Sequence, residues 1–216
     1  MTKEGGLPKR SDVGQEDAEL IELSEDDLRK RTAVFSFDQI LMRDRLNSGE
    51  DWHKVVMGHL YVDHIFINML AEALPNSASI KLSRLGFQQK LELVDAMGLV
   101  PKELVGVANL INRIRNKIAH SLDFSITEKD QTDLRNSVPK DMRDALTMAN
   151  VHSIRFTIDE SGVPNLSGLL FVTVLQTDLV RQQNAYRRLS ERRARAKLAQ
   201  ALKDYDEGTS GSGPAL

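Results

Sequence analysis

Hydrophobic positions recur along most of this chain at the three- and four-residue spacing of an amphipathic α-helix. A first helix is predicted from Ser24, which can cap it together with Asp27, to about Leu46, where the sequence NSG breaks the pattern. A second helix is predicted over residues 50–74 and ends at Pro75. Its apolar positions are spaced for one helix face: Val56, Leu60, Ile67, Leu70 and Leu74.

Two further helices are predicted in the middle of the chain. The first carries four apolar residues at helical spacing and can be closed by Gly98; these residues are Phe87, Leu91, Val94 and Met97. Pro101 suits the first position of the next helix, which contains the segment LINRIRNKIAHSL over residues 110–122.

The C-terminal part of the chain mixes helical signals with one strand signal. Short helices are predicted at about 128–137 and 139–149, separated at Pro139. The sequence VHSIRFTI, residues 151–158, alternates as a strand does, and DESG is typical of the turn after it. A long helix is predicted over 169–203, although its start, LLFVTV, is rich enough in β-branched residues to fit a strand as well.

These elements predict a mainly α-helical protein with a short strand or hairpin before the last long helix. The chain of 216 residues is long enough for one domain with a substantial core. We expect a disordered arm over residues 1–20, a helical domain over 21–205 with its core at 50–150, and a flexible tail over 206–216.

Composition narrows the classes of function. A net charge of −2 argues against a protein that coats nucleic acid over its whole surface, although local basic patches remain compatible with it. The chain contains no cysteine, which excludes disulfides, thiolate metal sites and cysteine nucleophiles. Neither a signal peptide nor a membrane span is expected, and a cytoplasmic location is therefore predicted.

The helix around residues 110–122 has two contrasting faces. An apolar stripe is formed by Val107, Ile111, Ile114 and Ile118. Arg113, Asn116 and His120 align on the opposite side, and Arg115 lies at the flank of the stripe. Such a polar face is either an ordinary solvated surface or a site that cleaves RNA. Metal-free RNA cleavage needs a group that moves protons near neutral pH, a cation for the phosphorane charge and an orienting group, and His, Arg and Asn supply these in that order.

A family resemblance favours the second interpretation. RNKIAH, from Arg115 to His120, resembles the R-(polar)-x-x-x-H signature of the HEPN superfamily. The longer segment LGFQQKLELVDAMGLVPKELVGVANLINRIRNKIAHSL is similar to the branch that includes mannitol operon repressor-like proteins, and the resemblance covers roughly residues 50–125. It implies an up-and-down helical bundle of HEPN type, commonly a homodimer, in which the motif helices of two subunits meet at a shared cleft.

The same resemblance implies specific roles for the motif residues. Active members of the superfamily cut RNA without metal and leave a cyclic phosphate, so neither a metal nor another cofactor is expected. Carried over, Arg115 binds the phosphate, Asn116 orients it and His120 is the acid or base. Arg113 lies on the face of His120 with a looser spacing and is the second candidate for the arginine.

These features lead to two hypotheses. The first is a metal-independent endoribonuclease with RNA as its substrate, acting as a toxin or an antiviral defence component with an antitoxin or regulatory protein as partner. The second is a non-catalytic HEPN-like protein that binds nucleic acid or regulates transcription. The joint presence of Arg115, Asn116 and His120 favours the first.

The predicted helix over 50–74 also carries candidate site residues. His53, His59, Asp63 and His64 lie on it, but no third ligand completes a metal site, and solvated or capped histidines are the simpler interpretation. Members of the resembling family place an acidic residue opposite the motif helix. Asp63 is therefore expected to pair with an arginine or to fix the charge of His120, with His64 as a second supporting residue.

The last predicted helix is strongly basic. From residue 181 to 203 it carries a single acid, Glu191, against eight basic residues: Arg181, Arg187, Arg188, Arg192, Arg193, Arg195, Lys197 and Lys203. Arg188, Arg192 and Arg195 are candidates for following a nucleic-acid backbone, since several cations on one helix can displace counterions from phosphates. The alternative is a solvated helix tied to the acidic N-terminal segment. Tyr186 is the one aromatic residue nearby, which argues against sequence reading by base stacking.

Overall fold

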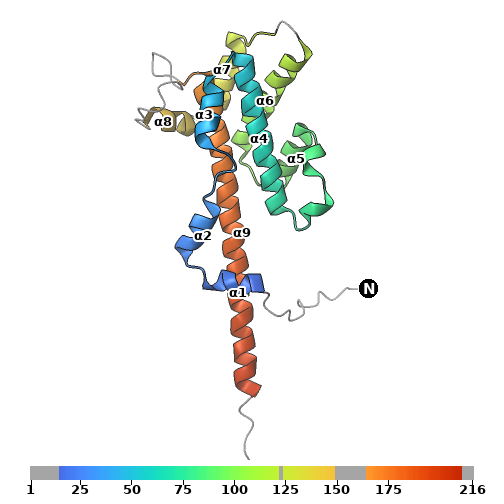
Figure 1. Cartoon of the computed structure of the whole chain (residues 1–216), viewed down its shortest axis with the longest axis vertical. Helices are drawn as coiled ribbons and strands as arrows, with labels where there is room; N and C mark the ends of the chain where they lie inside the picture. Colours follow the sequence, from blue (N-terminus) through green and yellow to red (C-terminus); the bar gives the residue numbers. More distant parts are fainter. Residues whose placement is uncertain (1–14, 122–123, 149–163, 211–216) are drawn as a thin grey trace, which may run out of the picture. The chain divides into compact units, whose positions relative to one another are not determined.

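A computed structural model describes residues 15–121, 124–148 and 164–210, and within them the chain is mainly α-helical (Figure 1). Nine α-helices occur in these residues: α1 (Gln15–Glu22), α2 (Glu25–Thr32), α3 (Gln39–Asn47), α4 (Asp51–Ala73), α5 (Phe87–Ala96), α6 (Lys102–His120), α7 (Glu128–Ser137), α8 (Lys140–Met148) and α9 (Leu166–Ser210). Two short 3-10 helices, η1 (Ser77–Ser79) and η2 (Leu82–Arg84), lie between α4 and α5. The mainly α-helical fold class is thus confirmed.

The chain divides into two compact units, each described separately below. The core unit comprises Val34–Asn184, and the terminal unit combines Met1–Ala33 with Ala185–Leu216. The division passes through α9.

Helix α4 is the centre of the core unit. It contacts α3, α5 and α6, and α7 packs against α6 (Figure 1). The fully buried side chains of α4 include Val62, Ile65, Phe66 and Met69. The stripe predicted for this helix was placed partly wrongly, because Leu60 is 52% exposed and Val56 is only half-buried. Because several helices surround α4, its burial is not confined to one stripe.

Helix α6 has the faces that the sequence predicts. Val107, Ile111 and Ile114 are buried, and Ile118 is half-buried at the edge of the core. Gly98, which closes α5, adopts a φ of 62°, a left-handed conformation that glycine takes without steric strain. Pro101 is the residue that caps α6 and not its first helical residue, a shift of one position.

The first part of α9 is a buried helix and not a strand. Leu169, Leu170, Val172, Val174 and Thr173 are almost completely buried, which explains a run that is apolar on all sides. The hydroxyl of Thr173 donates to the Leu169 carbonyl at 2.7 Å, so this polar group is satisfied within the helix.

The predicted helix from Ser24 to Leu46 is wrong in its length. Ser24 does cap α2, because its Oγ accepts a hydrogen bond from the amide of Asp27 at 3.0 Å. Helix α2 ends at Thr32, however, and α3 begins only after Asp38, whose carboxylate accepts bonds from two amides of the first turn. Between them Ser36 donates to Asp178 from its amide at 3.3 Å and its hydroxyl at 2.5 Å.

Asp178 is the centre of a buried ionic network in the core unit. Its side chain has no solvent exposure and accepts a bond from Arg181 Nε at 2.8 Å. The Arg181 guanidinium also binds Glu72 at 2.6 Å and the carbonyl of Val34. Burial alone would raise the pKa of Asp178, but hydrogen bonds from Arg181, Ser36 and Gln182 outweigh it and hold the pKa below its ordinary value.

The remaining predictions concern the helices around Pro139, the two ends of the chain, the strand at 151–158 and membrane spans. Helices α7 and α8 confirm the pair predicted around Pro139. Residues 15–20, expected in a disordered arm, belong to α1, and α9 extends into the expected tail as far as Ser210. The strand predicted at 151–158 lies outside the described residues. None of the helices described is both long enough and apolar enough to span a bilayer.

Candidate active site on helix α6

An open groove runs along the polar face of α6. It has a volume of about 1040 Å³. From α6 it is lined by Asn109, Asn112, Arg113, Asn116, Lys117 and His120. The opposite wall is formed by Asp133, Asn136 and Ser137 of α7, and Gln88 of α5 contributes at the side. The groove lies entirely within the core unit.

The structure places three of the predicted site residues in this groove. Arg113, Asn116 and His120 all line it, as their spacing of three and four residues predicts. His120 is the last residue of α6, and both His120 and Asn116 are exposed. Arg113 is also largely exposed, and its guanidinium lies 3.9 Å from Asp133 across the groove.

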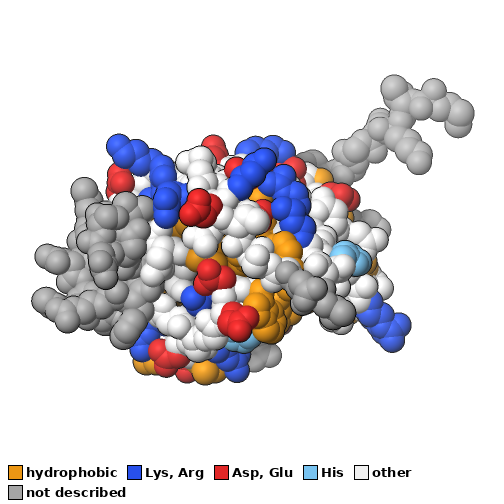
Figure 2. All heavy atoms as spheres, turned by 90° about the horizontal axis from the view of Figure 1, so that it is seen from above, with side chains coloured by type: hydrophobic (Ala, Val, Ile, Leu, Met, Phe, Trp, Pro, Cys, Tyr) orange, Lys and Arg blue, Asp and Glu red, His pale blue; other side chains and the backbone are white. Residues whose placement is uncertain are grey.

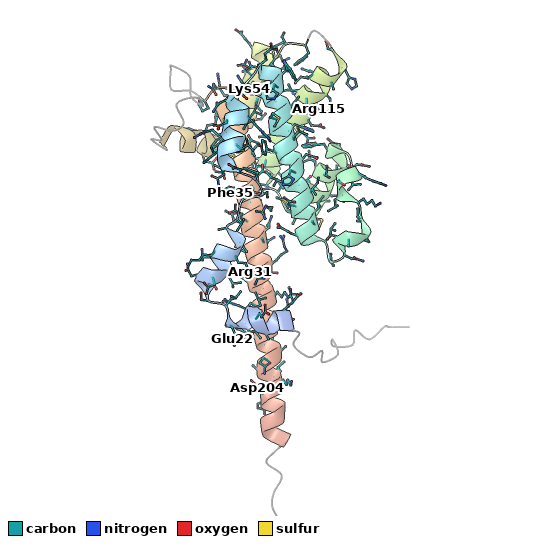
Figure 3. All side chains as sticks on the ribbon, in the orientation of Figure 1. Glu22, Arg31, Phe35, Lys54, Arg115 and Asp204 are labelled. Atoms are coloured by element: carbon teal, nitrogen blue, oxygen red, sulfur yellow. The ribbon has the colours of Figure 1, made fainter. Side chains whose placement is uncertain are left out.

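Arg115 lies outside the set of residues that line the groove. It is half-buried on α6, where Figure 3 labels it, and its Nη1 donates to Asn116 Oδ1 at 3.3 Å. Arg115 therefore acts on the groove indirectly, because it holds the carboxamide of Asn116 in place. Arg113, the second choice from the sequence, is the arginine that shares the groove with His120.

The wall of the groove includes a buried histidine, His59, where the sequence pattern indicates a solvated or capped one. His59 is 7% exposed and stacks on Phe87 with ring centroids 4.2 Å apart. Its Nε2 lies 3.2 Å from Asn112 Oδ1, so this nitrogen carries the proton and donates. Asn112 in turn donates to Gln88 at 3.4 Å, and Gln88 donates to Glu92 at 3.2 Å.

Burial is the main reason that the pKa of His59 is lowered below 6.5. The hydrogen bond with Asn112 and the charge of Asp63 oppose this shift, whereas the nearby charges of Arg115 and Lys90 add to it. The neutral imidazole is thereby favoured. A neutral His59 that donates from Nε2 keeps Asn112 and Gln88 in one orientation at the groove wall.

The expected supporting roles of Asp63 and His64 are not what the structure shows. The carboxylate of Asp63 binds Lys90 Nζ at 2.6 Å, and Lys90 is 2% exposed. Among the described residues, Asp63 thus pairs with a buried lysine of α5 and neither with an arginine nor with His120. His64 Nε2 lies 3.2 Å from the Ser36 carbonyl and 3.1 Å from Asn68, also away from the groove.

An ion pair fastens α7 to α6. Lys117 Nζ lies 2.8 Å from the buried carboxylate of Asp130, which also accepts a bond from the Thr127 hydroxyl at 2.8 Å. Burial alone would raise the pKa of Asp130, but the hydrogen bonds from Lys117 and Thr127 hold it below the ordinary value. The two walls of the groove are therefore connected by a charged contact that persists at neutral pH.

In the terminal unit, the acidic N-terminal helices neutralise part of the basic helix. Arg192 binds Asp17 at 2.6 Å and Glu16 at 3.0 Å, and these bonds raise its pKa. Arg193 binds Glu25 at 2.7 Å. Arg195 approaches Glu191 of its own helix at 4.0 Å. The alternative in which this helix is tied to the acidic segment therefore has direct structural support at Arg192 and Arg193.

No cluster of three or more metal-ligating side chains was found within the described part of the chain. Comparisons of the whole chain with family models, curated proteins and solved structures gave no match. The α6–α7 groove, defined by its own geometry and chemistry, is the candidate site.

Proposed function

We propose that this protein is a metal-independent endoribonuclease of HEPN type that cuts single-stranded RNA in the α6–α7 groove. The observation that carries the proposal is that Arg113, Asn116 and His120 line one open groove. A cation, an orienting amide and an imidazole are the groups that phosphodiester cleavage requires without a metal.

The reaction is a transesterification. The RNA 2′-hydroxyl attacks the adjacent phosphorus while a base removes its proton, and the bond from phosphorus to the 5′-oxygen breaks. An acid protonates that oxygen, which leaves a cyclic phosphate on one fragment and a 5′-hydroxyl on the other. Arg113 stabilises the charge on the phosphorane oxygens, and Asn116, held by Arg115, orients the phosphate.

This reaction needs two proton transfers, whereas His120 is the one histidine that lines the described groove. In a homodimer with a shared cleft, the second proton-transfer group is His120 of the other copy. The exposure of His120 at the end of α6 is compatible with such an arrangement. In this proposal the nuclease is a toxin or an antiviral defence component, and a partner protein restrains it.

The charge distribution supports a second candidate, a protein that binds nucleic acid without cutting it. Arg113 lies beside Asp133, and on the face shown in Figure 2 basic side chains (blue) are interspersed with acidic ones (red). Acids beside the cations weaken the stabilisation of a phosphorane. In that case the groove would hold a phosphate, and the protein would act as a regulator.

Cleavage of RNA in EDTA tests the proposal. The parent protein is expected to cut single-stranded RNA and leave cyclic phosphate ends. His120→Ala is expected to lose about a hundredfold to ten-thousandfold in rate, the contribution typical of a general acid or base. His53→Ala, on α4 and outside the groove, is the control and should cut like the parent. A parent protein that binds RNA but never cuts it would support the regulatory function instead.

A further inference from the structure

Helices α3 and α4, which lie side by side in the core unit, expose a strip of apolar side chains (Figure 1). Leu60 of α4 is 52% exposed, and Leu41 of α3 is 45% exposed. From Leu60 the row continues at steps of four residues through half-buried Val56 to exposed Trp52. These residues and half-buried Met57 are called the α3–α4 strip. Contiguous exposed apolar surface of this kind is typical of a site that binds another protein.

The strip contains a pocket of about 320 Å³ between the two helices. Leu41, Met57 and Leu60 form its walls. Phe37 also lines it and packs edge-on against Tyr61, with ring centroids 5.3 Å apart. The volume lies at the lower end of the range for ligand pockets, roughly 300–1,000 Å³. An open pocket of this size fits one or two apolar side chains of a partner better than it fits a whole small molecule.

The strip is also elongated. At 1.5 Å per residue, about 12 Å of helix separates Trp52 from Leu60. A partner helix that carries apolar side chains at steps of three and four residues presents anchors over the same length, and such helices bind by laying their apolar face in a groove. The dimensions of the strip therefore match an amphipathic helix of about two to three turns.

The acidic side chains of α3 and of the start of α4 are already engaged. Asp38 accepts hydrogen bonds from two amides in the first turn of α3, at the positive end of the helix dipole. Asp44 pairs with Arg43 at 3.0 Å. Asp51 pairs with Lys54 at 2.9 Å. These acids therefore provide no partner for a further cation.

Arg45 is a cation of the pocket whose charge is not balanced. Its exposed guanidinium lies 3.4 Å from the Tyr61 hydroxyl, and within the described part of the chain no carboxylate pairs with it. His64, the other basic residue that lines the pocket, lies 3.2 Å from the Ser36 carbonyl. An occupant that complements this surface therefore places a carboxylate beside its apolar side chains.

We infer that the α3–α4 strip is the docking surface for an acidic amphipathic helix of a partner protein, with its leucine-like side chains in the pocket and a carboxylate on Arg45. A second copy of this chain fits less well, because a two-fold contact would bring the strip against itself, and its acids are engaged. The inference goes beyond the proposed function and does not depend on it.

The probe is a pair of peptides of about 14 residues, or roughly four helical turns, with leucines at helical spacing and either glutamates or lysines between them. Trp52 is the single tryptophan of the chain, so docking on the strip should shift its emission to shorter wavelength. The glutamate peptide is expected to bind about tenfold more tightly than the lysine peptide. The net charge of −2 favours the lysine peptide, so the opposite preference reports the local charge of the strip.

Substitution of Arg45 tests the charged contact. Arg45→Gln should remove most of the preference for the glutamate peptide, and Arg45→Glu should reverse it, because the pocket then presents an anion. Arg84→Gln removes an exposed arginine outside the pocket and should bind both peptides as the parent does. An unchanged glutamate preference in Arg45→Gln would overturn the inference.

Substitution of Leu60 tests the apolar contact. Leu60→Gln should weaken the binding of both peptides about tenfold or more and leave the melting temperature unchanged, because this side chain is largely exposed. The matched control is Leu93→Gln on α5, an exposed leucine outside the pocket, which should bind like the parent. Parent-like peptide binding by Leu60→Gln would place the peptides elsewhere and contradict the inference.

Sedimentation distinguishes the partner helix from a second copy. If neither peptide binds, and the parent is a dimer whereas Leu60→Gln is a monomer, the strip is a contact between copies and the inference fails. It also fails if neither peptide binds and the two proteins have the same mass. RNA cleavage is measured separately, because the residues of the strip do not line the α6–α7 groove. The nuclease can therefore fail while the docking holds, and the reverse.

Discussion

Asp178 shows how one charged residue organises the core unit. A carboxylate with no solvent exposure is tolerated because Arg181, Ser36 and Gln182 all donate to it. The same network holds the segment between α2 and α3 through Ser36, and it leaves Arg181 free to bind Glu72.

Asp178→Asn keeps the shape of the side chain but leaves Arg181 buried beside a neutral group. We expect a loss of about 3–5 kcal/mol in the free energy of unfolding, as is typical when one partner of a buried ion pair is removed. Urea unfolding measures this change. The control is Asp44→Asn on α3, whose exposed pair with Arg43 should contribute no more than about 1 kcal/mol. Equal midpoints for the two variants would show that the network is not stabilising.

His59 gives the core unit a pH dependence whose sign follows from its lowered pKa. In the unfolded chain the imidazole titrates near its ordinary value of 6.5, whereas in the folded protein it stays neutral to lower pH. As the pH falls below 6.5, the unfolded state binds a proton first, and stability is lost until the folded-state pKa is reached.

We therefore expect the parent protein to lose more stability than His59→Gln when the pH is lowered from about 7.5 to about 5.5. Melting temperatures at both pH values measure the difference, and the other histidines contribute equally to the two proteins. A His59→Gln variant with the same pH dependence as the parent would contradict the buried, neutral imidazole. Glutamine keeps an N–H that can donate to Asn112, so the comparison isolates the titration of the imidazole.

Among the elements, those whose boundaries depend on local chemistry were predictable. Gly98 closes α5 and Pro139 separates α7 from α8, because glycine and proline act on the backbone at their own position. The polar face of α6 was also predictable, since helical periodicity alone brings Arg113, Asn116 and His120 together.

Features that depend on distant residues were not predictable from the sequence. In the segment between α2 and α3, the amide of Ser36 donates a hydrogen bond to Asp178, which is 142 residues away in the sequence. His59 is buried against Phe87 and Asn112, the latter 53 residues away, and Asp63 is taken by Lys90. No local pattern carries this information, because these contacts are made only when the helices pack.

The ion pairs between α1 and the basic helix α9 lead to a prediction about RNA binding. Arg192 is held by Glu16 and Asp17, but these side chains are partly or largely exposed, so the contact contributes little and is easily displaced. If this helix follows an RNA backbone, Glu16→Gln with Asp17→Asn should raise RNA affinity and steepen its salt dependence by about one counterion. Adding Arg192→Gln should cancel the gain.

Titration of RNA binding against salt concentration measures this effect. The opposite change is a triple variant in which Gln replaces Arg188, Arg192 and Arg195. It should bind RNA more weakly, and the salt dependence of its affinity should flatten by about one counterion for each contact removed. Identical slopes in all the variants would leave α9 as a helix whose charges serve the contact with the acidic segment alone.

For the whole molecule, the chemistry of the groove predicts an assembly. A single His120 in the described groove serves one proton transfer, and cleavage needs two. We therefore expect a homodimer at about micromolar concentration, with an interface on the order of 1,600 Å² in total, the usual size for a stable complex. Sedimentation should give twice the chain mass of 24.2 kDa. Parent protein mixed and refolded with an excess of His120→Ala should lose activity beyond simple dilution, because each parent chain then shares its cleft with a chain that lacks the imidazole. A 24.2 kDa monomer that cuts RNA, with activity proportional to the parent protein in the mixture, would show that one chain carries out both proton transfers.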